Sequence, residues 1–274
     1  MKSDNSLGQA PDRRIALLID ADNVSHSKIA LILAELSKHG TANIRRAYGD
    51  WGSSGLKGWK GKLHDFAIKP VQQFSYSTGK NATDIALVID AMELLYTQDL
   101  DAFCIASSDA DFTPLIMQLK ANGHQVYGFG ARKTPDPFVN ACTTFLYLES
   151  LGDEGVPAEP EMPSSDPSTI NSLEAGIKAI ASNISKADLA KDKTLVTILR
   201  GAVDAAAWDD GWASMAAAGS AAKRQSSIDP RNYGVKNFPQ LFQAIGLFDI
   251  FKGEGGQSFV ADRRNTDRDP RPTR

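Results

Sequence analysis

The fold is decided by a short stretch near the amino terminus, Ile15-Ala16-Leu17-Leu18-Ile19-Asp20-Ala21-Asp22-Asn23. Five consecutive apolar residues are typical of a strand that is buried on both faces, as in a parallel sheet covered by helices. The apolar run stops at Asp20, and further polar residues follow before the next apolar segment. This stretch therefore predicts a central parallel strand with acidic side chains at its carboxyl end.

The following residues, up to position 149, repeat the alternation of short apolar runs with longer segments of helical spacing. Such repeated strand–helix units form a mainly parallel sheet. The expected strands are 15–20, 44–49, 68–74, 103–107 and 125–129, and the expected helices are 24–39, 56–66, 83–96 and 112–122. We therefore predict an α/β domain over residues 13–149, with a five-stranded parallel sheet flanked by helices.

The composition changes after this domain, where prolines, glycines and acidic residues crowd together. We interpret residues 150–168 as a linker. A second unit, at 169–264, has helical segments at 173–184 and 194–207, then a strand-like pair at 247–252 and 258–261. Helices followed by a hairpin fit a small winged-helix domain, and a generic small α+β domain fits the periodicity equally well.

The two ends of the chain differ from both units in composition. We expect residues 1–12 to be a disordered amino terminus and residues 265–274 to belong to a basic tail. The tail is also expected to be disordered, since residues 263–274 hold five arginines against two aspartates, with two prolines.

The composition of the 274 residues, 42% hydrophobic and 23% charged, is that of a soluble protein. The longest apolar runs have six residues, far below the roughly 18–20 needed to span a bilayer, so no membrane partner is expected. The first residues contain no apolar signal segment, and we expect a cytoplasmic protein. Cys104 and Cys142 are too few for a disulfide framework, so both are expected to be reduced core residues. The net charge of −3 does not select an anionic partner.

Polar residues follow two of the predicted strands at the point where each ends. Asp20 and Asn23 follow the first strand, and Asp109 and Asp111 follow the fourth. Because the carboxyl ends of parallel strands meet at one edge of a sheet, we expect these side chains on the same rim. Asp84, at the start of the third predicted helix, can join them.

Carboxylates gathered in this way repel one another, by roughly 3 kcal/mol for a pair about 5 Å apart at an effective dielectric of about 20. A bound cation offsets that repulsion. Oxygen ligands without a His or Cys cluster favour Mg²⁺ or Mn²⁺ over zinc. These ions suit phosphodiester cleavage, because they activate water and stabilise a charged transition state.

Helix capping is the competing explanation for individual acids. Ser108 with Asp111, and Asn81 with Asp84, have the spacing of a capping residue and an acid in the first turn. Capping does not explain why all these polar residues collect at strand ends, so we favour a joint site. Asp90 lies well round the third helix from Asp84, and we interpret it as a surface residue or a neighbour of the site.

These residues resemble the NYN domain of the PIN-like nuclease superfamily, in its bacterial LabA-like branch. The resemblance spans about residues 13 to 149 and rests on three ordered motifs: Leu17-Leu18-Ile19-Asp20-Ala21-Asp22-Asn23, Gly79-Lys80-Asn81-Ala82-Thr83-Asp84 and Ala106-Ser107-Ser108-Asp109-Ala110-Asp111-Phe112. It implies a PIN-like parallel sheet, a Mg²⁺ or Mn²⁺ site and ribonuclease activity. Asp20, Asp84 and Asp109 would be the metal-binding carboxylates, assisted by Asn23 and Asp111. One departure is that Asn81-Ala82-Thr83 stands where Gly-Val often precedes the helix aspartate.

The second unit resembles the LOTUS domain, also called OST-HTH, over about residues 190 to 264. The matching segments are Asp210-Gly211-Trp212, Ile228-Asp229-Pro230-Arg231-Asn232-Tyr233-Gly234, residues 238–245, Phe248-Asp249-Ile250 and Phe259-Val260. This family is a winged-helix fold with RNA-binding members, and it often accompanies NYN domains. The residues best placed to touch RNA are Arg231, Tyr233 and Lys236, together with Lys223 and Arg224. An Ala-rich stretch at 213–222 replaces larger side chains, which predicts an altered groove.

Basic and aromatic residues also gather in the first domain, and we expect them to bind RNA: Arg45, Arg46, Lys57, Trp59, Lys60 and Lys62. A solvated charged face is the plain alternative. The function we expect is a divalent-metal-dependent ribonuclease, with Mg²⁺ or Mn²⁺ as cofactor and single-stranded or structured RNA as partner; homo-oligomerisation stays open. The alternatives are a catalytically inactive RNA-binding regulator and a metal-dependent phosphatase on the same fold.

Overall fold

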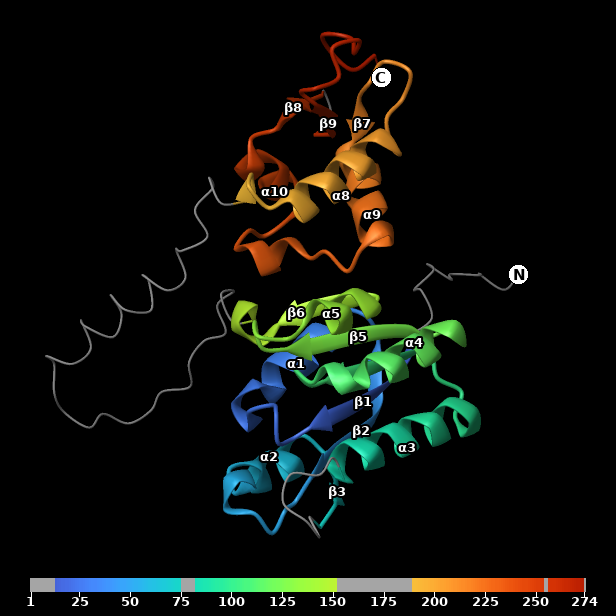
Figure 1. Ribbon diagram of the computed structural model, residues 1–274, viewed down its shortest axis with the longest axis vertical. Coiled ribbons are helices and arrows are strands. Elements are labelled where there is room, and N and C mark those ends of the chain that lie inside the picture. Colours follow the sequence, from blue (N-terminus) through green and yellow to red (C-terminus); the bar gives the residue numbers. More distant parts are fainter. Residues whose placement is uncertain (1–12, 75–81, 152–188, 254–255, 274) are drawn as a thin grey trace, which may run out of the picture. The chain divides into compact units, whose positions relative to one another are not determined.

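The computed structural model describes residues 13–74, 82–151, 189–253 and 256–273. The chain divides into two compact units, Met1–Leu151 and Gly152–Arg274 (Figure 1). The expected disordered amino terminus at 1–12, Asn81, and the expected helix at 173–184 lie outside the described residues. No helix of the described part is long and apolar enough to cross a membrane.

The first unit is built on a parallel sheet of six strands in the order β3-β2-β1-β4-β5-β6. The strands are β1 (Arg14–Asp20), β2 (Thr41–Gly49), β3 (Lys69–Gln72), β4 (Ala102–Ala106), β5 (Gln125–Gly130) and β6 (Thr144–Tyr147). The chain runs outward from β1 to β3 and then returns to the other side of β1 with β4. The two halves of the sheet therefore meet between β1 and β4, which is where α/β folds of this kind place their ligand sites.

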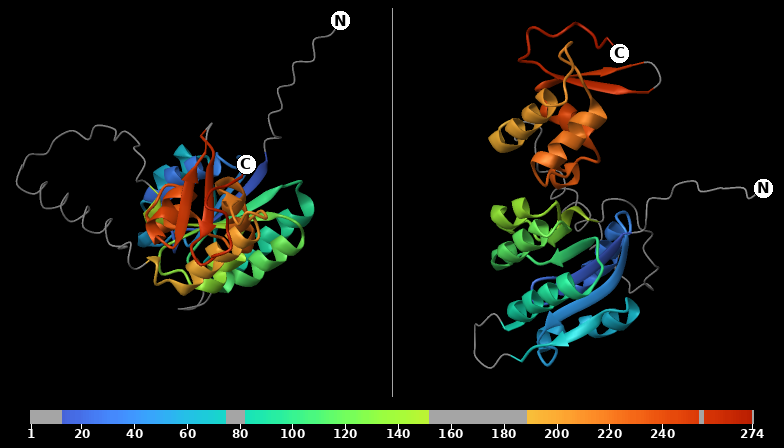
Figure 2. Two further views of the ribbon diagram at one scale, coloured as in Figure 1. Left: turned by 90° about the horizontal axis from the view of Figure 1, so that it is seen from above. Right: turned by 90° about the vertical axis from the view of Figure 1, so that its right-hand side faces the viewer.

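Helices cover both faces of this sheet, as the right-hand view of Figure 2 shows. The described helical segments of the unit are η1 (His26–Lys28), α1 (Ile29–Leu36), η2 (Ser54–Leu56), α2 (Trp59–Asp65), α3 (Ala82–Thr97), η3 (Ala110–Phe112), α4 (Thr113–Ala121), α5 (Asp136–Ala141) and η4 (Leu148–Ser150). Alternate residues of β1 serve the two sides: Leu17 packs with α1 and α2, and Leu18 packs with α3, α4 and α5. The α/β class is confirmed.

The prediction of five strands is wrong by one, because β6 was missed. This strand has four residues, of which Phe145 and Leu146 are buried, and it pairs with β5 along its whole length. A run this short is not separable by pattern from a buried turn, since periodicity needs more residues to show. The preceding α5 was missed for the same reason, with six residues.

Two predicted helices begin later than expected. Ser25 Oγ accepts a hydrogen bond from the Ser27 backbone N–H and starts the single 3-10 turn η1, so the α-helix expected from residue 24 begins at Ile29. Ser53 does the same before α2, which begins at Trp59. Short polar side chains thus bond locally to the backbone and delay regular helix.

In its described residues, the second unit combines three α-helices with a small antiparallel sheet. Its described elements are α8 (Lys193–Asp204), β7 (Ala213–Ser214), α9 (Met215–Gln225), η5 (Pro230–Tyr233), α10 (Phe238–Ile245), β8 (Phe248–Lys252) and β9 (Ser258–Asp262). The sheet order is β7-β9-β8, so the predicted strand pair forms a hairpin with one further short strand beside it. Leu199, Leu241 and Phe242 are completely buried in the core between the helices. The helices and hairpin agree with the winged-helix expectation.

The expectation of a disordered basic tail is wrong for residues 263–273, because this segment packs back on its own unit. Arg268 lies over the ring of Trp212 at 5.3 Å and pairs with Asp249. The Trp212 indole N–H donates to the backbone carbonyl of Asp269 at 2.9 Å. The buried carboxylate of Asp210 accepts from both the N–H and the hydroxyl of Thr273. Composition missed these contacts because their partners lie 19 to 63 residues earlier in the chain.

Candidate functional site

Asp20 is the last residue of β1 and its side chain is 1% exposed. One carboxylate oxygen, Oδ2, accepts hydrogen bonds from Asn23 Nδ2 at 2.6 Å and from Ser107 Oγ at 2.7 Å. Burial raises the pKa of Asp20, and the hydrogen bonds from Ser107 and Asn23 oppose that rise. The sheet therefore holds a buried carboxylate in a fixed orientation at the end of its central strand.

Ser107 joins the ends of β1 and β4. Its hydroxyl donates to Asp20 and accepts from the backbone N–H of Asp109 at 3.0 Å, and the Ser107 N–H bonds to the Phe129 carbonyl at 2.9 Å. Gly130 makes this junction possible, because a Cβ at that position would lie 2.5 Å from the Ser107 carbonyl oxygen. One buried hydroxyl thus sets the positions of Asp20 and Asp109 relative to each other.

Asp84 completes the acidic group from the first turn of α3. Burial raises the pKa of Asp84 to about 6, and repulsion from Asp20, Asp109, Asp111 and Asp22 adds to the rise. Carboxylates from β1, the segment after β4 and the start of α3 are therefore close enough to repel one another electrostatically. We call Asp20, Asp22, Asp84, Asp109 and Asp111 the acidic rim.

Asp22 was not among the predicted site residues. The hydroxyl of Thr83, next to Asp84, bonds to its carboxylate, while burial and the charges of Asp20 and Asp50 raise its pKa. The motif around residues 17–23 already contained Asp22, and its place two residues beyond Asp20 was the signal. Asp90 is placed elsewhere: it pairs with Arg46 at 2.7 Å and accepts from the buried Tyr48 hydroxyl at 2.7 Å.

Capping and clustering both occur at Asp109. Its Oδ1 accepts from the Asp111 N–H at 2.9 Å and so caps η3, whereas the expected cap, Ser108, accepts from the Ala131 N–H at 2.8 Å instead. The capping residue was therefore predicted one position too early, at Ser108 in place of Asp109. Asp109 keeps its second carboxylate oxygen clear of that cap, so one side chain can serve both purposes.

The donor atoms of the acidic rim are of the kind that a hard divalent cation prefers. All are oxygens, and among the described residues no Lys, Arg or His pairs with Asp20, Asp84 or Asp109 to neutralise them. Like-charge repulsion adds to the effect of burial in raising the pKa of Asp84, and a bound cation would offset that repulsion. In the described part of the chain, however, no group of three or more His, Cys, Asp or Glu side chains is arranged so that it could hold a metal ion.

The predicted RNA-binding residues of the first unit separate into two groups. Lys57 and Lys60 are exposed, and Lys62 is 44% exposed beside Asp65 and the Phe66 ring. Trp59, by contrast, is 2% exposed and packs edge-on against Trp51, so the expectation that it stacks on RNA is wrong. A tryptophan flanked by lysines looks the same in sequence whether its helix turns it inward or outward.

The two arginines of β2 are engaged within the unit. Arg45 donates to the backbone carbonyls of Ala42 and Phe66 at 3.0 and 2.9 Å, and Arg46 pairs with Asp90. Phe74, two residues beyond β3, was not among the predicted RNA-binding residues, and it is 60% exposed. It lies at the carboxyl end of an edge strand, on the same side of the sheet as the acidic rim.

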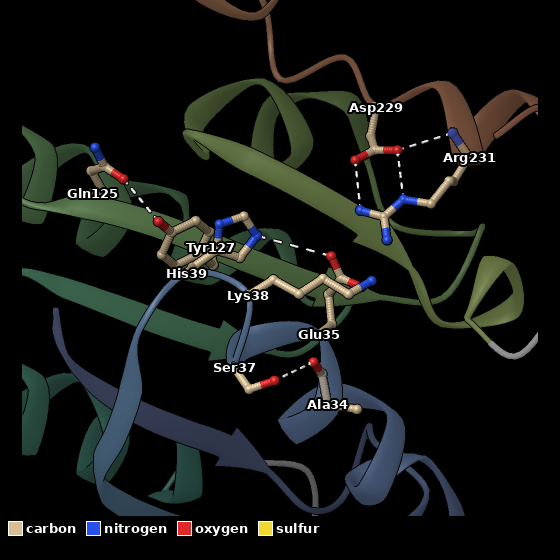
Figure 3. A network of polar contacts seen from close by, with 9 residues as sticks. All are labelled: Ala34, Glu35, Ser37, Lys38, His39, Gln125, Tyr127, Asp229 and Arg231. Carbon is tan, nitrogen blue, oxygen red and sulfur yellow. Dashed lines mark hydrogen bonds and ion pairs between the residues drawn. The ribbon is translucent and has the colours of Figure 1, made fainter. Parts of the chain in front are cut away.

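In the second unit, Arg231 turns back on its own loop. Its guanidinium donates to both carboxylate oxygens of Asp229, at 2.9 and 2.8 Å (Figure 3). Tyr233 packs half-buried against the core, and Lys236 is exposed. Of these three predicted RNA contacts, Lys236 alone presents an exposed cation.

Both units match known families. Residues 14–149 match the family model of the NYN domain, and residues 189–260 match that of the OST-HTH/LOTUS domain. An uncharacterized protein of Methanocaldococcus jannaschii is 31% identical over 124 residues, which cover 44% of this chain and 48% of that protein, so the match spans about half of that relative's length. A solved structure of a protein of unknown function from Vibrio parahaemolyticus is 16% identical, with a TM-score of 0.44, and covers 52% of this chain and 96% of that one.

Proposed function

We propose that this chain, which has an NYN domain at residues 14–149 and an OST-HTH/LOTUS domain at residues 189–260, is a divalent-metal-dependent ribonuclease. The two domains support a role in RNA cleavage or RNA binding. The observation that carries the step to cleavage is the acidic rim, where Asp20 and Asp109 share the Ser107 hydroxyl and both repel Asp84.

Asp20, Asp84 and Asp109 would hold the cation, with Asn23 and Asp111 assisting. When bound, Mg²⁺ or Mn²⁺ supplies an activated water and stabilises the negative charge of phosphodiester displacement. Without a cation, the rim repels the phosphates of RNA, because its carboxylates carry the same sign of charge. The charge balance of the site therefore makes RNA binding near the rim dependent on the cation.

The chain's own residues orient the chemistry. The side chains of Ser107 and Asn23 both donate to Oδ2 of Asp20. The other oxygen, Oδ1, accepts a longer hydrogen bond of 3.3 Å, from the backbone N–H of Asn23. A carboxylate whose rotamer is fixed by buried hydrogen bonds loses little entropy when it binds a cation, and such support by neighbouring groups is typical of metal ligands. Asp84 and Asp109 approach from separate elements, so the site depends on the folded sheet.

RNA would reach the rim along Lys57, Lys60 and Lys62, which supply positive charge for the phosphates. Phe74 offers an exposed ring on which an unpaired base can stack. Aromatic stacking favours single strands, because the faces of bases in a duplex are already covered.

A catalytically inactive RNA-binding protein is the second candidate. It is favoured because, among the described residues, no group of three or more His, Cys, Asp or Glu side chains is arranged to hold a metal ion. The metal-dependent phosphatase has no comparable observation in its favour.

The test is incubation of the full chain with single-stranded, duplex and structured RNA, in Mg²⁺, Mn²⁺ or chelator. We expect cleavage in the metal arms only, and at least a hundredfold loss for Asp84→Asn. Glu93→Gln is the matched control, because Glu93 is an exposed acid on the same helix and should leave cleavage unchanged. RNA retention without cleavage in either metal would establish the inactive binder instead.

A further inference from the structure

The second unit contains a groove whose described lining includes one of the residues that the sequence predicted to touch RNA, Lys223. It lies between α9, the amino-terminal end of α10 and the strand start at residues 256–258, and it encloses about 770 Å³. This volume is within the range of pockets that take a small organic group such as a nucleotide. We call it the α9–α10 groove.

Two aromatic side chains line the groove, Trp208 and Phe238. Both are half-buried, so each has part of its ring in contact with the core and part open. Trp208 rests against Phe259 with 5.9 Å between ring centroids, and Phe238 rests against Phe242 at 6.4 Å. Rings supported in this way are rigid surfaces, which lowers the entropy lost when a planar group packs on them.

The groove is open because α9 presents small side chains to it. Ala216, Gly219 and Ser220 line it, and a Cβ at position 219 would lie 3.1 Å from the Phe238 ring. Larger side chains at these positions would fill the space. The Ala-rich composition of residues 213–222 is therefore what creates the groove.

The charge of the groove fits an anion. Lys223 is the one charged residue among its described lining, and its Nζ lies 5.9 Å from the centre of the Phe238 ring. Lys236 is exposed next to the lining residue Asn237, and Lys252 is exposed and paired across the hairpin with Ser258. An aromatic surface bordered by lysines matches a base attached to a phosphate, the repeating unit of single-stranded nucleic acid.

Polar groups for the edge of a base are also present. Asn237 Oδ1 is used to cap α10, where it accepts from the Gln240 N–H at 3.0 Å, so its amide N–H groups remain to donate elsewhere. Gln257 and Ser220 are exposed at the groove. A peptide side chain would use the apolar surface, but it would leave the lysines without a partner.

We propose that the α9–α10 groove binds an unpaired base of single-stranded RNA, with the base packed on Trp208 and Phe238 and its phosphate beside Lys223. The proposal rests on the RNA-binding role proposed above and gives it a location. Duplex RNA is excluded from the groove, because its bases are stacked and paired and cannot enter.

The experiment measures binding of the full chain to a fluorescein-labelled twelve-nucleotide RNA, in chelator so that no cleavage occurs. Ala216→Trp fills the groove and should weaken binding of the single strand at least tenfold. Gln243→Trp places the same residue at an exposed position of α10 outside the lining, and should bind as the wild type does. Thermal unfolding of both variants verifies that each is folded.

Charge gives a second, independent arm. Lys223→Ala should weaken binding about threefold and reduce the slope of log affinity against log salt by about 0.7, the value for one phosphate contact on a single strand. Arg224→Ala removes a charge from the neighbouring exposed residue, which does not line the groove, and should change the slope less. Unlabelled RNA should also quench tryptophan fluorescence in the wild type, and the quenching should disappear in Trp208→Phe.

Unchanged affinity in Ala216→Trp and Lys223→Ala, without quenching in the wild type, would overturn the proposal and leave a protein segment as the better occupant. That outcome would not bear on the ribonuclease, which is measured separately by cleavage in Mg²⁺ or Mn²⁺. Conversely, if the chain cleaves no RNA in either metal but the groove variants still weaken RNA binding as expected, the ribonuclease proposal fails and the binding site stands.

Discussion

The acidic rim and the α9–α10 groove differ in what the surrounding fold does for them. At the rim, residues from three parts of the chain are brought together, and the buried hydroxyl of Ser107 fixes two of them. In the groove, the decisive residues are small ones on α9 that leave space beside Phe238. A site of charged groups needs buried hydrogen bonds to hold those groups in position, whereas a groove needs only small side chains that leave it open.

The comparison first predicts opposite roles for two tryptophans. Trp59→Ala should lower the free energy of unfolding of the first unit by about 3–5 kcal/mol, because a completely buried aromatic side chain is lost. Trp208→Ala should cost the second unit less, since Trp208 is half-exposed at the groove, but it should weaken RNA binding. Urea unfolding with RNA titration of both variants checks this. An equal stability loss in the two variants would contradict the distinction between core and groove.

Removal of Ser107 tests whether the rim depends on buried support. Ser107→Ala leaves the buried carboxylate of Asp20 with one donor fewer and the Asp109 N–H without its acceptor, and should cost about 1–3 kcal/mol. Cleavage should fall more than tenfold, because Asp20 and Asp109 lose their common partner. Ser108→Ala is the control: it removes one bond to Ala131 and leaves Asp20 untouched. If the two variants cleave RNA equally well, Ser107 does not position the rim.

The burial of Asp84, together with the repulsion at the rim, predicts a pH dependence of stability in chelator. The pKa of Asp84 is raised to about 6 in the folded state, so the folded state holds this proton more tightly than the unfolded state does. The contribution of Asp84 to stability is therefore lost as pH rises from about 4 through 6. Since Asp84 is partly exposed, solvent screening limits the loss to about 1 kcal/mol.

Asp84→Asn removes this dependence. We expect the variant to gain stability over the wild type at pH 7.5 and to gain much less at pH 4.5, measured by urea unfolding in chelator. Mg²⁺ or Mn²⁺ should then stabilise the wild type more than the variant, by mass action on the folded state. A stability difference between the two proteins that is the same at both pH values would show that neither burial nor the other rim carboxylates raise the pKa of Asp84.

The smallest stability effect is expected for the lysines of the first unit. Replacing Lys57, Lys60 and Lys62 together by Ala should change the free energy of unfolding by less than about 0.5 kcal/mol per residue, since these side chains are largely exposed. The salt slope of RNA binding should fall by up to about 2 units. Arg14→Ala, at the amino end of β1, is the control charge. Identical slopes in the triple variant and the wild type would mean that this face is merely solvated.

The sequence predicted the first unit well because its strands are long apolar runs. Ile15 to Ile19 are all completely buried, as a parallel strand covered on both faces requires. Prediction failed at β6 and α5, whose four and six residues are too short to show a period. The tail after residue 262 was also misjudged, because Asp210, Trp212 and Asp249 hold it from distant positions.

Carboxylates and cations were not equally predictable. Acids that follow buried parallel strands must lie at one edge of the sheet, so the sequence alone determined the neighbourhood of Asp20 and Asp109. Basic and aromatic residues carry no such constraint. Arg231 pairs with Asp229 and Arg46 pairs with Asp90. Trp59 is buried in the core.

The sequence by itself thus determined the order of the longer elements, the α/β class and four of the five acids of the rim, Asp22 being the exception, because these follow from apolar runs and from the residues at their ends. Only the tertiary structure decided that Ser107 joins Asp20 to Asp109, that the tail packs on Trp212, and that α9 leaves a groove beside Phe238. The physical reason is range: strand burial depends on neighbours in the chain, whereas hydrogen-bond partners and open space depend on residues that meet only when the chain is folded.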